Sequence, residues 1–242
     1  MVDLKEFEQK AADLRVLGMK ISIGQDTVYE KYWDEDCRRN IYSASKSFTS
    51  CAVGFAVQEG LIDLDERLMD AFKEDIPNNP DENLKKATVK DLLTMTLGQE
   101  KGFLMGKQRP RMEEQNWVKA SLAIPFVYEP GTHFVYNNVG PYLAGILVQR
   151  RAGCDLLSYL TPRLLKPLGI RKTIWEVDPE GNTFGAGGLF LTVSELHKLG
   201  MFYLQNGCWN GKKLLSKEWI HESTRKQVEN NKNSYGYGYL FW

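Results

Sequence analysis

The sequence lacks long hydrophobic runs and has no excess of charge of either sign. No apolar stretch approaches the length of a membrane span, and the first residues hold no hydrophobic signal core. Lysine and arginine together number 31, as do aspartate and glutamate, so the formal net charge is zero. A neutral chain offers no basic field to nucleic acid or to an anionic membrane. We therefore predict a cytoplasmic protein with a small-molecule substrate, no nucleic-acid partner and no membrane span, whose oligomeric state stays open.

Cysteine is scarce and follows no pattern. The four cysteines are far apart and form no C-x-x-C motif, a spacing typical of reduced thiols in the cytoplasm, although the sequence leaves a disulfide open. There is no H-E-x-x-H motif and no paired set of cysteine and histidine, so we predict neither a metal site nor a cofactor. The cysteines are Cys37, Cys51, Cys154 and Cys208.

Several common catalytic motifs are also missing. The sequence has no G-x-S-x-G elbow, which removes the anchor of an α/β-hydrolase triad. It has no P-loop and no G-x-G-x-x-G after a strand pattern, so nucleotide binding is unsupported. The histidines, His133, His197 and His221, are scattered, which favours structural roles over catalytic ones.

The rest of the chain alternates between helical and extended patterns. Apolar spacing predicts an amphipathic helix from Leu4 to near Gly18, and alternation predicts a β-hairpin over 19–23 and 27–33. Capping boxes at Thr88 and Thr192 predict the starts of two further helices. Other predicted elements are helices from Ser43 to near Gly60, over 113–122, 139–150 and 155–165 and after Ser216, and extended segments at 133–138 and 235–242.

One stretch, 40–57, combines a serine and a lysine with an apolar helix. Ser43 and Lys46 are three positions apart, so on a helix they share one face about one turn apart. The residues that follow are apolar on nearly every side, which predicts a central helix. A lysine at the mouth of such a helix loses hydration, and its pKa falls towards the range where the free amine takes a proton from a hydroxyl. The pattern thus predicts an activated serine nucleophile.

The Ser-x-x-Lys pattern is short, and chance alone can produce it. A second copy, Ser223 and Lys226, lies in a polar run where we predict a solvated face. The alternative interpretation of Ser43 and Lys46 is a capping serine and a lysine that reaches solvent. The apolar helix favours catalysis only modestly, so the choice depends on a partner motif.

Such a motif lies 90 positions beyond Lys46. Tyr136-Asn137-Asn138 is the only Y-x-N in the chain. A tyrosine near a lysine can pass a proton between nucleophile and leaving group, and an amide two residues on can bind a substrate carbonyl or the lysine. The alternative is a turn asparagine after an edge-strand tyrosine. The two motifs in this order are a stronger indication than either alone.

With these motifs, the sequence resembles the penicillin-recognising serine hydrolases. The resemblance is to the class C β-lactamase-like branch, which includes D-alanyl-D-alanine carboxypeptidases and esterases. It spans essentially the whole chain in the expected order. The segments that carry it are 43–49, 60–65, 88–96, 130–138, 167–170 and 187–189.

The resemblance implies a role for each of four residues. Ser43 would be the acylated nucleophile, and its backbone N–H one donor of an oxyanion hole. Lys46 and Tyr136 would share the roles of base and proton carrier, because the identity of the acylating base is disputed in this superfamily. Asn138 would orient Lys46 and the amide of the substrate.

The sequence departs from the family pattern in two places. Where the family often has His-Thr-Ser-Gly, residues 95–98 read Met-Thr-Leu-Gly, a change that we expect to be structural. The family's third motif, Lys-Thr-Gly or His-x-Gly, lies beyond the aromatic segment, whereas this sequence stops at Trp242. We therefore expect a truncated sequence whose sheet is short of strands, with an exposed edge and a catalytic site that lacks one wall.

The implied fold is of the α/β (α+β) class and like that of β-lactamases and transpeptidases. A single domain over 1–242 would combine an antiparallel sheet lobe (1–41 and 182–242) with a helical lobe (42–181). The implied function is a serine hydrolase that forms an acyl-enzyme with an ester, a β-lactam or a D-amino-acid amide. The rival is a non-catalytic binding or regulatory module, or an inactive fragment, and the missing third motif favours it. The substrate itself cannot be read from the sequence.

Overall fold

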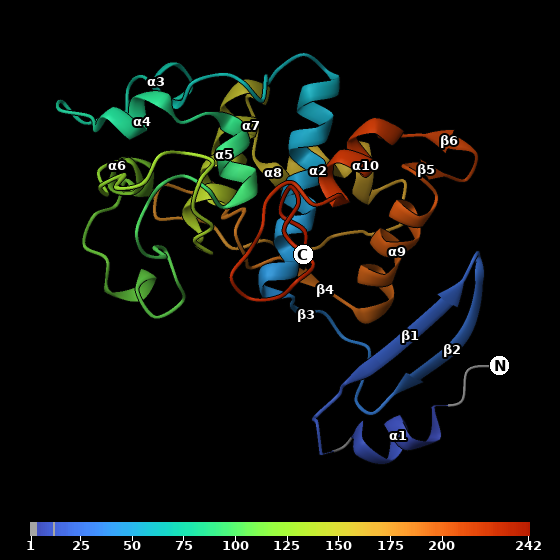
Figure 1. Cartoon of the computed structure of the whole chain (residues 1–242). Helices are drawn as coiled ribbons and strands as arrows, with labels where there is room; N and C mark the ends of the chain where they lie inside the picture. The colour runs from blue at the N-terminus through green and yellow to red at the C-terminus, as the bar shows by residue number, and fades with distance from the viewer. Residues whose placement is uncertain (1–3, 12) are drawn as a thin grey trace.

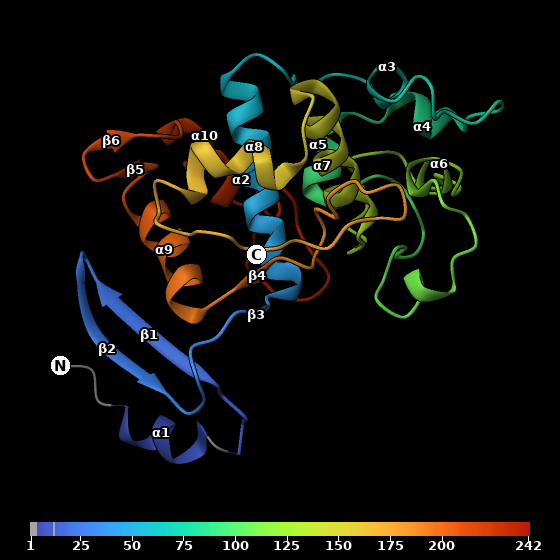
Figure 2. The ribbon, with the colours of Figure 1, turned by 180° about the vertical axis from the view of Figure 1, so that it is seen from behind.

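A buried helix runs through the middle of the molecule. The computed structural model describes residues 4–11 and 13–242. Helix α2 (Ser45–Gln58) lies at its centre, and other helices surround it (Figure 1 and Figure 2). Eleven of its 14 residues are buried, so the helix has neighbours on nearly every side, as the apolar pattern predicts.

Among the described elements, α2, α7 and α9 are the longest helices, and the others are short. The other helices are α1 (Lys5–Ala11), α3 (Leu68–Ala71), α4 (Glu82–Lys86), α5 (Val89–Thr94), α6 (Trp117–Leu122), α7 (Val139–Ala152), α8 (Leu156–Leu160), α9 (Val193–Leu204) and α10 (Lys217–Thr224). Three tighter or wider turns are η1 (Tyr42–Ala44), η2 (Arg109–Arg111) and the π-helical η3 (Thr161–Leu165). The strands are β1 (Gly18–Ile23), β2 (Asp26–Tyr32), β3 (Arg39–Asn40), β4 (Phe190–Leu191), β5 (Cys208–Trp209) and β6 (Lys212–Lys213).

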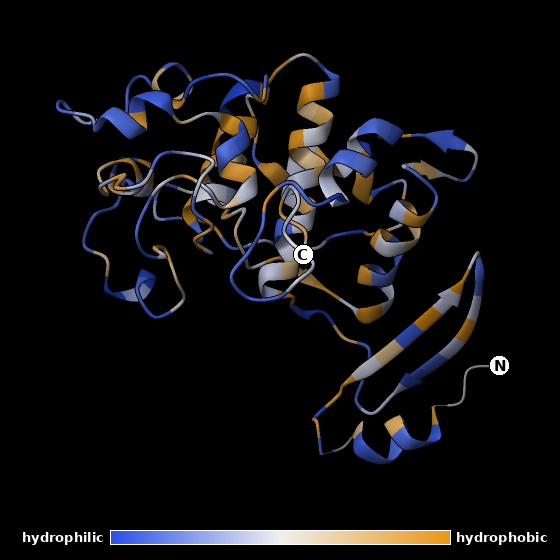
Figure 3. Cartoon of the chain, in the orientation of Figure 1, coloured by the Kyte–Doolittle hydropathy of each residue, from blue (hydrophilic) through white to orange (hydrophobic). Residues whose placement is uncertain are grey.

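Helices α5, α7 and α8 form, together with α2, the core of the molecule. Helix α2 packs against α7 and α8, and α7 also packs against α5. Phe48 and Val53 of α2 and Leu143 and Leu147 of α7 have no exposed surface. Burying a side chain of this size stabilises the fold by roughly 1.5–3 kcal/mol. Apolar bands recur along α2 in Figure 3, in agreement with its central place.

The strands form three separate antiparallel pairs, β1 with β2, β3 with β4 and β5 with β6. The β1–β2 hairpin lies beside α9, away from the central helix (Figure 1). There the hydroxyls of Tyr32 and Ser194 are 2.9 Å apart, and Arg38 pairs with Glu195 at 2.6 Å. The described strands thus form small antiparallel sheets, in agreement with the predicted mixed α and β class. The division into a sheet lobe and a helical lobe stays a prediction.

Several predicted elements are confirmed. The hairpin occurs where alternation places it, with one irregularity between Ile21 and Ser22. The capping box before α5 is formed, because the N–H of Thr88 donates to Oδ2 of Asp91 at 2.8 Å. The box before α9 is also present, and α7 ends at a left-handed Gly153.

The first predicted helix is wrong in length. Helix α1 ends at Ala11 rather than near Gly18. Leu14 is 65% exposed, so the apolar spacing that predicts a longer helix does not continue a buried face. The helix predicted over 113–122 likewise begins only at Trp117, because Asn116 caps it and accepts a hydrogen bond from the N–H of Lys119.

The aromatic segment 235–242 is buried in part but is not a strand. It makes a single bridge to Val228, and then the N–H of Leu240 donates to the carbonyl of Leu93 at 2.9 Å. Gly236 and Leu240 have positive φ angles of 85° and 63°, which break the extended backbone that a strand needs. The predicted extended segment 133–138 also pairs with no strand in the described residues.

Two glycines in helices give opposite expectations for alanine. A Cβ on Gly54 of α2 would overlap the indole of Trp219 on α10. The missing side chain therefore lets α10 pack closely on the central helix. We expect Gly54→Ala to lower the free energy of unfolding by about 1–3 kcal/mol, despite the better helix propensity of alanine.

Gly200 of α9 is the matched control, because no atom lies within 4 Å of a Cβ built there. Gly200→Ala should raise the free energy of unfolding by about 0.5–1 kcal/mol. Urea titrations of both variants measure these changes. Equal stabilisation by the two substitutions would contradict the close packing of α10 on α2.

Candidate active site

The serine of the first motif lies in the turn that leads into α2. Ser43 sits in η1 and is exposed. Ser45, two residues on, is buried, and its Oγ accepts a hydrogen bond from the N–H of Leu189 at 3.1 Å. Of these two hydroxyls, only that of Ser43 is open to a substrate. Tyr42, directly before it, has a φ of 48°, a strained left-handed conformation that bends the chain at this point.

Lys46 is buried in the first turn of α2, with 2% of its surface exposed. Its Nζ lies 3.2 Å from Oγ of Ser43. The same nitrogen donates to Oδ1 of Asn138 at 2.8 Å and to the carbonyl of Ala186 at 2.6 Å. These contacts place the amine between the serine turn, the start of α7 and the glycine-rich segment 185–188.

The pKa of Lys46 is low for a lysine. Two causes together lower it to about 7: burial, which removes the hydration of the ammonium form, and to a smaller extent the positive charge of Arg109. The groups that bind the amine are a hydroxyl, an amide oxygen and a backbone carbonyl, none of which carries a negative charge. A substantial fraction of the molecules therefore holds this amine in its neutral form at neutral pH.

The three contacts of Nζ match the bonding capacity of a neutral amine. A neutral amine has two N–H donors and one lone pair. Asn138 Oδ1 and the Ala186 carbonyl are acceptors and use both donors. The lone pair is then left to face the hydroxyl of Ser43. In this state the geometry suits transfer of the Ser43 proton to Lys46.

Tyr136 lies beside the same amine. The Nζ of Lys46 is 5.2 Å from the centre of the Tyr136 ring. Burial raises the pKa of the phenol above its usual range, and a hydrogen bond with Ser43 offsets part of that rise. The phenol thus keeps its proton at neutral pH. Trp242 stacks on this ring with centroids 5.5 Å apart and an interplanar angle of 23°.

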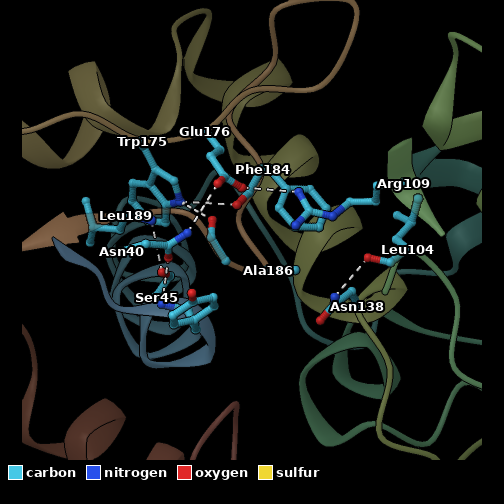
Figure 4. A network of polar contacts seen from close by, with 12 residues as sticks. Asn40, Ser45, Leu104, Arg109, Asn138, Trp175, Glu176, Phe184, Ala186 and Leu189 are labelled. Carbon is cyan, nitrogen blue, oxygen red and sulfur yellow. Dashed lines mark hydrogen bonds and ion pairs between the residues drawn. The ribbon is translucent and has the colours of Figure 1, made fainter. Parts of the chain in front are cut away.

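Asn138 is held at both ends of its side-chain amide. Its Nδ2 donates to the carbonyl of Leu104 at 2.9 Å, as Figure 4 shows. Its Oδ1 accepts from Lys46, so the amide is oriented by the irregular loop that contains Leu104. The structure therefore brings together all four residues that the sequence singles out: Ser43, Lys46, Tyr136 and Asn138.

The glycine-rich segment approaches the start of α2 through its backbone. Besides the Ala186 carbonyl that binds Lys46, the carbonyl of Gly185 accepts from Oγ1 of Thr49 at 2.6 Å. A Cβ on Gly185 would lie 2.9 Å from the carbonyl of Pro141, which is too close for a side chain. The absence of a side chain at position 185 thus allows this close approach of the two backbones.

Three further residues near the site carry no sequence motif. Arg109, Glu176 and Asn40 form a connected polar network that Figure 4 shows. Arg109 begins the short turn η2, Asn40 ends the two-residue strand β3, and Glu176 lies in a connecting segment. Only the spatial arrangement reveals them, since neither spacing nor residue type marks them in the sequence.

Other sequence candidates lie away from this site. Residues 95–98, where the family pattern is altered, are all buried, and Gly98 has a φ of 94°. A buried position agrees with a structural role for the change. The histidines contact other partners: the His133 ring stacks on Tyr128, His197 lies 3.0 Å from Ser22, and His221 lies 3.1 Å from Asn206.

The prediction that Ser223 lies on a solvated face is wrong. Ser223 is fully buried at the end of α10, and its Oγ donates to the carbonyl of Ile220 at 3.2 Å. The C-terminal segment covers it, because the N–H of Tyr239 donates to the Ser223 carbonyl at 2.9 Å. Lys226 lies beyond the helix and pairs with Glu229, so this second Ser-x-x-Lys forms no catalytic pair.

Residues 4–11 and 13–242 contain neither a metal-binding cluster nor a membrane-spanning helix. In that part of the chain, no three histidine, cysteine, aspartate or glutamate residues gather where they could hold a metal ion. No helix there combines the length and the apolar character needed to cross a bilayer.

Two curated proteins are similar to part of this chain. Monacolin J acid methylbutanoyltransferase of Aspergillus terreus is 31% identical over 157 residues, which are 57% of this chain and 37% of that protein. Lovastatin esterase of Penicillium rubens is 31% identical over 150 residues, 53% of this chain and 37% of that protein. The matched part thus spans little more than a third of the length of these relatives.

The fold and the family follow from two further matches. The octameric penicillin-binding protein homologue from Pyrococcus abyssi superposes with a TM-score of 0.79 at 22% identity, covering 99% of this chain and 64% of that one. This similarity confirms the predicted β-lactamase/transpeptidase-like fold. A family model described as Beta-lactamase matches residues 5–241. The chain therefore belongs to the β-lactamase family.

Proposed function

We propose that this chain is a serine hydrolase that forms an acyl-enzyme on Ser43. The observation that carries the proposal is a buried lysine amine with a pKa of about 7, placed 3.2 Å from the exposed hydroxyl of Ser43. A neutral amine at this distance can activate a serine without histidine. The substrate would be an ester, a β-lactam or a D-amino-acid amide. The names of the curated relatives, an esterase and an acyl transferase, favour an ester.

The proposed reaction has two halves. Oγ of Ser43 forms a bond to the substrate carbonyl carbon while its proton moves to Nζ of Lys46. The bond to the leaving group then breaks, and the phenol of Tyr136 supplies the leaving group with a proton. The ammonium of Lys46 gives its proton to the resulting phenolate, so that both side chains return to their starting states before the second half. Asn138 keeps the amine in position throughout. A water molecule then hydrolyses the acyl-enzyme and regenerates the Ser43 hydroxyl.

The phenol of Tyr136 suits this division of labour. Because its pKa is raised, the phenol is protonated at neutral pH. It therefore has a proton to give and cannot accept one from Ser43. We therefore assign the base role in acylation to Lys46. We also propose a cytoplasmic location, which the four free cysteines support.

The nucleophile can be tested by covalent labelling. A fluorescent fluorophosphonate should label the purified chain at Ser43. Ser43→Ala should reduce labelling by at least about 10³-fold, because it removes the serine hydroxyl that contacts the Lys46 amine. Mass spectrometry of the labelled peptide locates the adduct. Ser47→Ala, a half-buried serine in the same segment, is the control and should label normally. Absence of any adduct at Ser43 in the native chain would favour the non-catalytic rival.

The pH dependence tests the base. Acylation requires the neutral amine, so the burst rate with a p-nitrophenyl ester should rise through pH about 7 and level off above it. Because the pKa of Tyr136 is raised, no decline should begin below its usual range near pH 10. Stopped-flow measurements across this range give the profile. A rate that is flat or that falls between about pH 6 and 8 would contradict the assignment.

Lys46 should also reduce stability at low pH. Its folded-state pKa of about 7 lies below the 10.5 of an unperturbed lysine in the unfolded chain, so the buried charge destabilises the fold most at and below pH 7. Between pH 7 and 10.5 the Lys46 amine is protonated in the unfolded chain but largely neutral in the folded chain. The free-energy penalty therefore shrinks as pH rises through this interval. We expect Lys46→Met to abolish acylation while raising the free energy of unfolding by roughly 1–4 kcal/mol at about pH 6.

The advantage of Lys46→Met should shrink steadily towards pH 10. Lys90→Met is a suitable control, since Lys90 is an exposed lysine of α5. Chemical denaturation at several pH values measures both variants. A variant at position 46 that is less stable than the native chain at every pH would show that the amine does not carry a burial penalty.

A further inference from the structure

A polar network connects the serine turn to two segments distant in sequence. We propose that Arg109, Glu176 and Asn40 act as a clamp that positions the Ser43 turn against the loop supporting Asn138, with Arg109 and Glu176 as positioning residues. This inference rests on the proposed function. It names the residues that connect the serine turn to the loop supporting Asn138. Figure 4 shows the three side chains converging, with the Glu176 carboxylate between the other two.

One end of the clamp acts on the backbone beside Ser43. Asn40 is the last residue of β3, and its Oδ1 accepts a hydrogen bond from the N–H of Tyr42 at 2.7 Å. Tyr42 has the positive φ that bends the chain into the serine turn. A hydrogen bond at a strained residue helps to hold the strained conformation. Nδ2 of Asn40 donates to Oε1 of Glu176 at 3.2 Å, which in turn orients the Asn40 amide.

The other end acts on the loop that supports Asn138. Nη1 of Arg109 donates to Oε2 of Glu176 at 3.2 Å, so the two oxygens of one carboxylate serve the two partners. The guanidinium also lies over the ring of Phe184, 4.3 Å from its centre. Arg109 lies in the same irregular loop as Leu104. The carbonyl of Leu104 accepts the hydrogen bond from the amide of Asn138. The clamp therefore sets the distance between the serine turn and this loop.

Stability alone is a weak reason for this arrangement. The Nε of Arg109 is buried and has no hydrogen-bond partner among the described residues. A buried donor without a partner destabilises the folded state. Glu176 and Arg109 keep 37% and 24% of their side-chain surface exposed, and partly exposed pairs of this kind contribute little stability. We therefore explain the Arg109–Glu176 pair by its contacts with the serine turn rather than by a contribution to stability.

The clamp also fixes the position of a charge that affects the pKa of Lys46. The charge of Arg109 adds to burial in lowering the pKa of Lys46. Glu176 binds Arg109 and thereby fixes where that charge lies. The other groups around the amine are the hydroxyl of Ser43, the phenol of Tyr136, the amide of Asn138 and the carbonyl of Ala186. Of these only the phenol titrates, and its pKa is raised, so it stays neutral.

Arg109→Gln and Arg109→Lys separate charge from geometry. With an activated ester, Arg109→Gln should move the midpoint of the acylation profile to higher pH and slow acylation about three- to tenfold near pH 7, since the lost charge no longer favours the neutral amine. Arg109→Lys keeps the charge, so its midpoint should stay near the native value while its rate falls less. Arg111→Gln is the control, because Arg111 is exposed in the same turn, and both its midpoint and its rate should be native.

Hydrogen exchange of the serine turn gives a readout that does not depend on activity. The peptide covering 40–46 should exchange faster in Arg109→Gln and in Glu176→Gln than in the native chain or in Arg111→Gln. Native exchange in both variants together with a native pH midpoint in Arg109→Gln would overturn the clamp. If the native chain forms no acyl-enzyme, the proposed function fails, and the exchange comparison then decides the clamp by itself.

Discussion

The chemistry proposed for this chain depends on an amine kept out of water. Lys46 lies in the first turn of a central helix that packs against α7 and α8, and its amine is held inside by hydrogen bonds to Asn138 and Ala186. Its neighbours accept hydrogen bonds but bring no negative charge. Burial without a counter-ion is what lowers the pKa into the range where a lysine can serve as a base.

The surrounding elements hold partners around this amine. The β3–β4 pair and the strained Tyr42 bring the Ser43 hydroxyl to it, the start of α7 brings Asn138, and the segment 185–188 brings a backbone carbonyl. These segments are far apart in sequence. Their convergence explains how a chain without a histidine at its site could still activate a serine.

Several element starts could be predicted from local sequence, whereas the fold and the roles of the four central residues came from the family resemblance. The capping boxes at Thr88 and Thr192 depend on neighbours three residues away, and the apolar pattern of α2 depends only on spacing. The aromatic segment could not be predicted, because two positive φ angles redirect it onto the carbonyls of other elements. Arg109 and Glu176 could not be found either, since their importance lies in contacts across 67 positions of sequence.

The central claim is that the Lys46 amine changes protonation near neutral pH. It can be measured by NMR titration of the chain labelled with ¹³C at the lysine Cε atoms, with Lys46→Met to assign the signal. The account predicts that the signal missing from Lys46→Met titrates with a pKa of about 7 in the native chain. A Lys46 signal that titrates near 10.5, as an exposed lysine does, would contradict it.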